Sequence, residues 1–347
     1  MDYIEQIKAG IERLYKTNPN IHISVSRTHP KLNVASGLRS QIIIHSLDVF
    51  TRPSKNLTWA DVDENGVVTL CCCPNNIGQA LHNYLWTNGH HHVLMSGTMS
   101  DGKSFNYFEK ESGTVRTKKD KKQYTSTSSP FNYVKNTRLY MPEDLPMPPE
   151  VNDEAYITAI ADRIVELVKA TNGHTAILFT SYKTLSAVYG IAKEKLKEYK
   201  LISMTRGNKT AISDFKKADN AVLFASGTMW EGVDCVGDKL SSVIIVRLPF
   251  PMRSATMEEK KSASTNVRAF IDEYAIPEML IKLRQGVGRL IRSETDTGLI
   301  SILDTRATQS SYADRVQSVL AKHPRVNSID EIKEFFREIK PKEYFEN

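Results

Sequence analysis

One stretch of the chain has the residue types and spacing that bind nucleotide phosphates. Gly97 to Ser104 reads G-x-x-x-x-G-K-S, the pattern of a loop whose backbone N–H groups and lysine hold phosphates. Residues 91–95, which end in the apolar run Val93, Leu94 and Met95, precede it, as the strand before such a loop would. The tetrapeptide Ser-Gly-Thr-Met begins at Ser96 and recurs at Ser226, where no lysine follows. The first copy is therefore either a nucleotide-binding loop or a turn at the end of a strand.

A second stretch, 278–292, is expected to form a helix with a basic side. Gln285, Gly288, Arg289 and Arg292 recur at helical spacing, opposite a stripe of leucine and valine. Two arginines and a glutamine beside a glycine suit a phosphate, because guanidinium groups bind phosphate through paired hydrogen bonds and stay charged. Glycine weakens a helix, which predicts the close approach of a backbone or a ligand. The spacing alone fits a solvated basic face equally well.

The cysteines do not have the spacing of metal ligands. Cys71, Cys72 and Cys73 are consecutive in a predicted strand, so their side chains alternate between its two sides and cannot converge on one ion with Cys235. No C-x-x-C pair occurs. We expect a buried strand and no metal site.

Composition bounds the class of protein. The 347 residues are 40% hydrophobic and 25% charged, which is ordinary for a soluble globular protein of one large or two domains. The net charge of +6 weakly favours a polyanionic partner. No apolar run is long enough to span a membrane, and residues 1–16 lack the apolar centre of a secretory signal. We expect a cytoplasmic protein without a membrane partner.

The elements that must position the candidate residues follow an α/β pattern. The four prolines of 141–150 predict a linker between domains, and the basic run 116–122 is interpreted as a solvated loop rather than a binding patch. Beyond the linker, near-continuous apolar strands alternate with helices, which predicts a parallel sheet covered on both faces. Ligands bind such sheets at the carboxyl ends of strands, where both Ser-Gly-Thr-Met loops are expected.

Several motifs together resemble one family. "QGVGRLIR" at 285–292, followed by "SETDTGLISILDTR", is similar to the last helicase motif of the DinG/XPD family of superfamily-two DNA helicases. "SGTMWEGVDCVG" at 226–237 resembles the motif that precedes it in that family. "VIIVRLPFPMRS", "ILFTSYKTL" and "SPFNY" fit the segments between, in the expected order. The resemblance is collinear from about residue 55 to residue 340.

The resemblance implies an architecture of two RecA-like motor domains, with ATP between them and single-stranded DNA across both. Residues 1–60 would be a remnant of an arch insertion and its return, 61–141 the C-terminal part of the first RecA-like domain, and 142–341 the complete second domain. The family's phosphate loop, DEAH box and iron–sulphur cysteines lie upstream of the arch, and we find none of them in this chain. ATP and Mg²⁺ would thus require the N-terminal part of the same helicase, and the isolated chain is expected to be inactive.

The resemblance also assigns roles to residues. The first Ser-Gly-Thr-Met copy occupies the family's coupling motif, which favours a coupling loop over a phosphate loop, as does the short helix predicted after it. Arg292 would be the arginine finger, with Arg289 and Gln285 on the phosphates and the water network. The other assignments are nucleotide sensing by Glu231, Gly232, Asp234 and Gly288, coupling by Ser96, Gly97 and Thr98, and DNA contact by Ser181, Tyr182 and Thr228.

Two alternatives remain open at this point. Each assigned residue could instead stabilise a turn at the end of a strand. The protein could also be a non-catalytic module that binds nucleic acid or a partner, rather than the motor portion of an ATP-dependent helicase.

Overall fold

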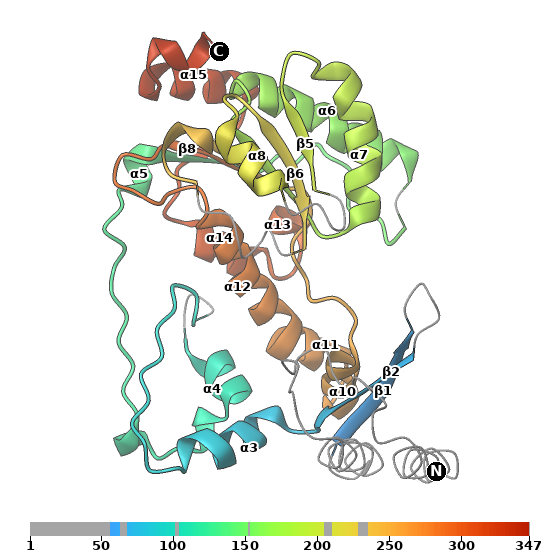
Figure 1. The fold of residues 1–347 in the computed structure, drawn as a ribbon, viewed down its shortest axis with the longest axis vertical. Coiled ribbons are helices and arrows are strands. Elements are labelled where there is room, and N and C mark those ends of the chain that lie inside the picture. Colours follow the sequence, from blue (N-terminus) through green and yellow to red (C-terminus); the bar gives the residue numbers. More distant parts are fainter. Residues whose placement is uncertain are drawn as a thin grey trace, which may run out of the picture. The chain divides into compact units, whose positions relative to one another are not determined.

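The larger sheet has seven parallel strands (Figure 1), and the loops and helices of the unit built on it contain the described candidate residues. Its strand order is β5-β6-β4-β7-β8-β3-β9. Ile177 of β4 lies opposite Phe224 of β6 and Ile244 of β7, so buried apolar residues meet across the sheet. The strands are β3 (Thr137–Tyr140), β4 (Thr175–Phe179), β5 (Leu201–Ser203), β6 (Val222–Ser226), β7 (Ser242–Ile245), β8 (Gly298–Ile302) and β9 (Arg325–Val326).

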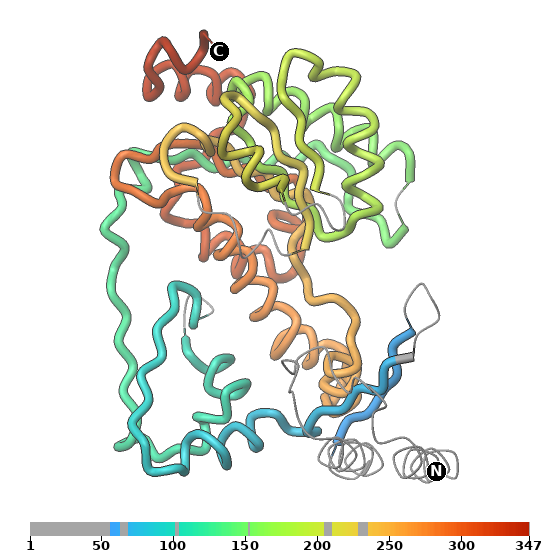
Figure 2. Tube along the Cα trace, in the orientation of Figure 1, coloured from blue at the N-terminus to red at the C-terminus, as the bar shows by residue number. Residues whose placement is uncertain are grey.

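The computed structural model describes residues 56–62, 68–100, 104–151, 153–204, 210–227 and 235–346. They divide into two units, and Figure 2 traces the chain through both. The first unit takes its residues from the chain up to residue 93, from 109–122 and from 252–270. The second, which holds the parallel sheet, takes 94–108, 123–251 and 271–347.

Successive residues of a strand point to opposite faces of the sheet. Both faces of this sheet are apolar, and helices cover each of them. Ile177 and Phe179 pack into one core, and Ala176 and Leu178 into the other. The first core is closed by α6 (Glu154–Ala170), α7 (Tyr182–Lys195) and α15 (Ile329–Ile339). The second is closed by α8 (Ala211–Lys217), α12 (Ile276–Val287), α13 (Arg306–Gln309) and α14 (Ala313–Leu320). The predicted fold class, a parallel sheet flanked by helices, is confirmed.

The strand just before the proline-rich stretch, β3, belongs to this sheet. β3 follows the short helix α5 (Tyr133–Asn136) and pairs in parallel with both β8 and β9. Met141 and Leu145, in the proline-rich stretch, are buried in the two cores. That stretch is therefore packed along part of its length, and the domain boundary at 142 stays a prediction.

The first unit is built around an antiparallel hairpin of β1 (Asn56–Val62) and β2 (Val68–Pro74). Trp86 Nε1 donates a hydrogen bond to the Ser112 carbonyl (2.6 Å), and Lys260 pairs with Glu111 (2.6 Å). The unit also holds α3 (Ile77–Leu81), η1 (His82–Trp86), the end of α4 (Asn106–Ser112), η2 (Thr114–Arg116), η3 (Lys119–Lys121), α10 (Ala255–Ala263) and α11 (Val267–Phe270).

Two local predictions are wrong. Cys71, Cys72 and Cys73 lie on a strand, but Cys72 is exposed and its neighbours are half-buried, because the strand pairs in a two-stranded hairpin rather than in a covered sheet. Residues 91–95 form no strand, and the side chains of Val93 and Met95 are 87% and 89% exposed. An apolar run becomes a strand only where another strand accepts its backbone hydrogen bonds.

Candidate functional site

Helix α12 carries the glycine-containing motif and ends earlier than the sequence predicts. Its first turn contains Pro277, and its apolar stripe is buried, as expected. The helix ends at Val287, and the N–H of its C-cap, Gly288, donates to the Arg284 carbonyl (2.9 Å). Leu290 and Ile291 are buried beyond that point, which holds the chain in a turn instead of a further helical turn. Arg289 and Arg292 therefore do not lie on a helix face with Gln285.

The C-terminal half of α12 binds the loop that contains the first Ser-Gly-Thr-Met copy. Arg284 Nη1 donates to the Ser100 carbonyl (2.8 Å), and Nη2 to the Gly97 carbonyl (3.4 Å). Gln285 Nε2 donates to Thr98 Oγ1 (3.2 Å). The structure thus brings together Gln285 and Thr98, which the sequence assigns to different roles.

Arg284 was not among the candidate residues predicted from the sequence. It lies four residues before Gly288 and so on the same face of the helix, and that spacing could have identified it.

Gln285 has one polar atom with nothing to bind in the described part of the chain. Its Oε1 is buried and accepts no hydrogen bond from the described residues. A buried carbonyl oxygen without a donor is costly, so such an atom is suited to a water or hydroxyl that enters the site.

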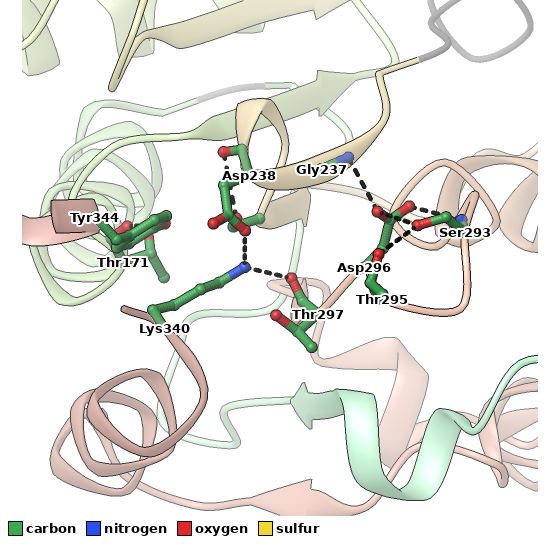
Figure 3. A network of polar contacts seen from close by, with 10 residues as sticks. Thr171, Gly237, Asp238, Ser293, Thr295, Asp296, Thr297, Lys340 and Tyr344 are labelled. Atoms are coloured by element: carbon green, nitrogen blue, oxygen red, sulfur yellow. Dashed lines mark hydrogen bonds and ion pairs between the residues drawn. The ribbon is translucent and has the colours of Figure 1, made fainter. Parts of the chain in front are cut away.

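The buried carboxylate of Asp296 holds the turn that contains Ser293, the residue after Arg292, and also binds Gly237 (Figure 3). Asp296 Oδ2 accepts from the N–H groups of Arg292 (2.7 Å) and Ser293 (2.8 Å). Its Oδ1 accepts from the Gly237 N–H (3.0 Å) and from the Ser293 hydroxyl (2.7 Å). Burial alone would raise the pKa of Asp296, but these donors outweigh it and the pKa is lowered.

Asp296 was also missed, although Ser293 and Gly298 around it have the composition of a tight turn. The Arg292 side chain is exposed, whereas Arg289 is half-buried. The carboxylate thus fixes the backbone of the turn to which the exposed Arg292 belongs.

Two of the residues predicted to contact DNA, Ser181 and Tyr182, follow the carboxyl end of β4, which pairs with β6. Ser181 follows β4 and caps α7, accepting a hydrogen bond from the Thr184 N–H (3.1 Å). Gly227 ends β6 with a positive φ of 70°, and a Cβ at that position would lie 3.5 Å from Tyr182 Oη. The Tyr182 hydroxyl is therefore close to Gly227, the residue that precedes Thr228 in the chain.

Four of the predicted residues lie outside the described part of the chain, namely Thr228, Glu231, Gly232 and Asp234. Among the residues that are described, no three His, Cys, Asp or Glu side chains are grouped so that they could hold a metal ion. Within the same residues, no helix has both the length and the apolar character that crossing a membrane requires.

Comparison with known proteins identifies the family. Residues 164–323 match the helicase C-terminal domain. The ATP-dependent DNA helicase YoaA of Haemophilus influenzae is 30% identical over 250 residues, which are 71% of this chain and 37% of that protein. The 3′-5′ exonuclease DinG of Staphylococcus aureus is 27% identical over 257 residues, which are 72% of this chain and 28% of that protein.

A solved structure named XPD_APO superimposes with a TM-score of 0.57 over 83% of this chain and 57% of that one, at 18% identity. That similarity shows the fold. The chain spans 37% and 28% of the lengths of the two relatives above. Its sheet, its matched domain and its relatives agree with the collinear motifs, and the chain therefore belongs to the DinG/XPD family of superfamily-two helicases.

Proposed function

We propose that this chain supplies the second motor domain of an ATP-dependent DNA helicase. The turn of Arg292 acts on ATP, residues 96–98 couple nucleotide state to movement, and the carboxyl ends of β4 and β6 form part of the track for single-stranded DNA. The observation that carries the proposal is the set of hydrogen bonds from Arg284 and Gln285 to residues 97–100. They link the helix of the last motif directly to the coupling loop, so neither can move without the other.

The residues at the end of α12 fit a nucleotide. ATP supplies the γ-phosphoryl group that water attacks, and negative charge spreads over its oxygens in the transition state. Arg292, exposed on a fixed turn, would stabilise that charge as an arginine finger, and Arg289 would hold phosphate oxygens. Gln285 would accept a hydrogen bond from water at its buried Oε1 while its amide group holds Thr98.

The loop at 97–104 is better suited to coupling than to binding phosphates. No strand precedes it, and α4 after it has only seven residues, Asn106–Ser112. Arg284 also binds the carbonyl groups of Gly97 and Ser100, which turns this side of the loop toward a protein cation. Lys103 lies outside the described residues. In the proposal, Mg²⁺ and the β- and γ-phosphates are held by the N-terminal part of the same helicase.

DNA contact at the carboxyl ends of β4 and β6 would use phosphates. The hydroxyl groups of Ser181 and Tyr182, and backbone N–H groups at the start of α7, are donors of the kind that bind the backbone of nucleic acid without reading its sequence.

The decisive variant is Arg292→Ala in a full-length helicase that contains this chain. We expect kcat for ATP hydrolysis to fall by about 10³-fold or more, with little change in ATP affinity, because a finger acts on charge that develops in the transition state. The matched control is Arg315→Ala, which removes an arginine that pairs with Asp272 (3.6 Å). An unchanged kcat with a lowered melting temperature in Arg292→Ala would mean that the turn is only structural.

The chain alone tests the competing functions. We expect it to show negligible ATP hydrolysis and to leave single-stranded DNA intact. DNA-stimulated turnover that Lys103→Ala abolishes would establish the loop at 97–104 as a phosphate loop. Degradation of DNA would favour the activity named for the Staphylococcus relative, and full activity of Arg292→Ala in the whole protein would favour a non-catalytic module.

A further inference from the structure

We propose that Asp296 is a positioning residue that sets the Arg292 turn and joins it to the end of the segment 226–237. The proposal rests on the proposed function of Arg292. It adds a residue that touches neither nucleotide nor DNA and acts through the backbone of its neighbours.

The hydrogen bonds of Asp296 leave the turn little freedom. Each carboxylate oxygen accepts two hydrogen bonds, and three of the four donors are backbone N–H groups, those of Gly237, Arg292 and Ser293. The residue is only 3% exposed. Hydrogen bonds to an ionised acceptor are shorter and stronger than neutral ones, and a buried site strengthens them further. The position of the Arg292 Cα is therefore fixed by a group four residues away.

The same carboxylate joins two loops that enter neighbouring strands. Gly237, with a positive φ of 73°, begins the turn η4 (Gly237–Lys239) that leads into β7. Asp296 lies two residues before β8, which pairs with β7. In the sequence, Gly237 closes the motif that contains Glu231 and Asp234, the proposed nucleotide sensors. A shift of the Gly237 backbone would thus be passed to the Arg292 turn through Asp296.

A second polar cluster beside this one offers a control (Figure 3). Lys340, whose side chain is 1% exposed, donates to Asp238 Oδ1 and to the Thr297 carbonyl (2.9 Å). Asp238 is adjacent to Gly237 in the chain, but the hydrogen bond that its carboxylate accepts from Lys340 ties it to the C-terminal region rather than to Arg292. Asp238→Asn therefore changes the same chemical group close by without touching the turn.

The test compares Asp296→Asn, Asp238→Asn and Arg292→Ala, with the double variant of Asp296 and Arg292, in the full-length helicase. In Asp296→Asn an NH₂ group replaces one carboxylate oxygen, so a hydrogen-bond donor faces the two donors that this oxygen accepted from. We expect kcat to fall by about 10²-fold, the effect of a misplacement near 1 Å, with KM for ATP within about twofold. Asp238→Asn should lower the melting temperature and keep kcat. The double variant should be no slower than Arg292→Ala, because both act through one group.

Hydrogen exchange on the chain itself gives an independent readout. In Asp296→Asn the amides of Gly237, Arg292 and Ser293 should exchange faster, while those of β7 and β8 stay protected. Unchanged kcat in Asp296→Asn beside an inactive Arg292→Ala would overturn this inference alone, as would a double variant slower than Arg292→Ala by the full single effect. An active Arg292→Ala would overturn the proposed function instead.

Discussion

The parallel sheet has an amino edge, where the chain enters its strands, and a carboxyl edge, where the chain leaves them. These two edges are built differently. At the amino edge, His174, Asp296 and His323 are buried in the loops that lead into β4, β8 and β9, and the buried Lys340, at the end of α15, reaches Asp238 in the loop before β7. At the carboxyl edge, Ser181 caps a helix, Gly227 makes a left-handed turn, and the buried Asp304 pairs with Arg306 (2.6 Å). Buried polar contacts fix the backbone of the loops that lead into β7 and β8, whereas the loops after β4 and β6 have hydroxyl and N–H groups that could serve a ligand.

This difference fits the two roles that we propose. An arginine that stabilises a transition state must be held in place before the reaction, which a buried carboxylate with four donors achieves. A track for DNA must accept any sequence and release it, which exposed caps and a glycine permit.

Adding one methyl group should destabilise the protein more at the amino edge than at the carboxyl edge. In Gly298→Ala the new Cβ would lie 2.1 Å from the Ser241 carbonyl oxygen, so β7 and β8 must move apart, at a cost of about 3 kcal/mol. In Gly227→Ala the nearest atom would be 3.5 Å away, and the left-handed backbone costs about 1 kcal/mol. Urea unfolding of both variants measures the two costs. Equal costs would mean that the edges are packed alike.

Acid should weaken the amino edge. Burial lowers the pKa of both His174 and His323 to about 4, with Lys322 adding to the effect at His323. Because these folded-state pKa values lie below the usual 6.5, the stabilisation is complete above pH 6.5 and is lost as the pH falls toward 4. We expect a loss on the order of 2 kcal/mol for each histidine between pH 7 and pH 4.5.

His323→Gln serves as the variant for that measurement. It should flatten the dependence of unfolding free energy on pH, since His323 Nδ1 lies 2.7 Å from Thr137 Oγ1 in a buried pair. Asp296 does not contribute in this range, because its lowered pKa means that its stabilisation is lost only at more acidic pH. An unchanged slope in His323→Gln would place the acid sensitivity elsewhere.

A pair of helix caps separates stability from DNA binding at the carboxyl edge. Ser181 caps α7 and Ser328 caps α15, each accepting from the N–H three residues later (3.1 and 3.2 Å). Replacement of either by alanine should cost about 1 kcal/mol of stability. Only Ser181→Ala should also weaken binding of single-stranded DNA, by about threefold, as fluorescence anisotropy would measure. Equal DNA affinity of the two variants would remove Ser181 from the track.

The basic run should have the smallest effect. Lys122 is engaged within its own unit, by Glu109 (2.8 Å) and the Thr114 carbonyl (3.1 Å), so the informative variant replaces only Lys118, Lys119 and Lys121 with glutamine. DNA affinity should change by less than about twofold and keep its steep fall with salt. Loss of all binding in this variant, with Ser181→Ala unaffected, would move the DNA site to the basic run.

Much of the sheet could be predicted from the sequence, because buried parallel strands are short apolar runs bounded by turns. β4, β6, β7 and β8 are apolar runs of this kind, and the helix α7 follows β4, in agreement with the predicted alternation of strands and helices. The predictions failed where local pattern and tertiary context compete. Residues 91–95 have strand-forming residues without a paired strand, and the helix predicted to residue 292 ends at Val287 because two glycines weaken it and Leu290 is buried in the following turn.

The candidate site was harder to predict than the sheet. Motif resemblance selected Gln285, Arg289 and Arg292, but the contacts that organise them come from Arg284 and Asp296. Both act on backbone groups that are distant in sequence, so spacing within one helix cannot reveal them. From the sequence alone, the carboxylate of Asp296 is expected to lie at the surface of a turn. Only the structure shows that hydrogen-bond donors surround it, one of them the Gly237 N–H.

The central claim, that Arg292 stabilises the transition state of ATP hydrolysis, is tested most directly with ADP and aluminium fluoride, which together mimic the transferring phosphoryl group. The full-length helicase should bind ADP–aluminium fluoride at least about 10²-fold more tightly than ADP, since a site complementary to the transition state favours its analogue. Arg292→Ala should lose that preference and keep its affinity for ADP. If Arg292→Ala retains the full preference for ADP–aluminium fluoride, the turn held by Asp296 does not act on the nucleotide, and the account is wrong.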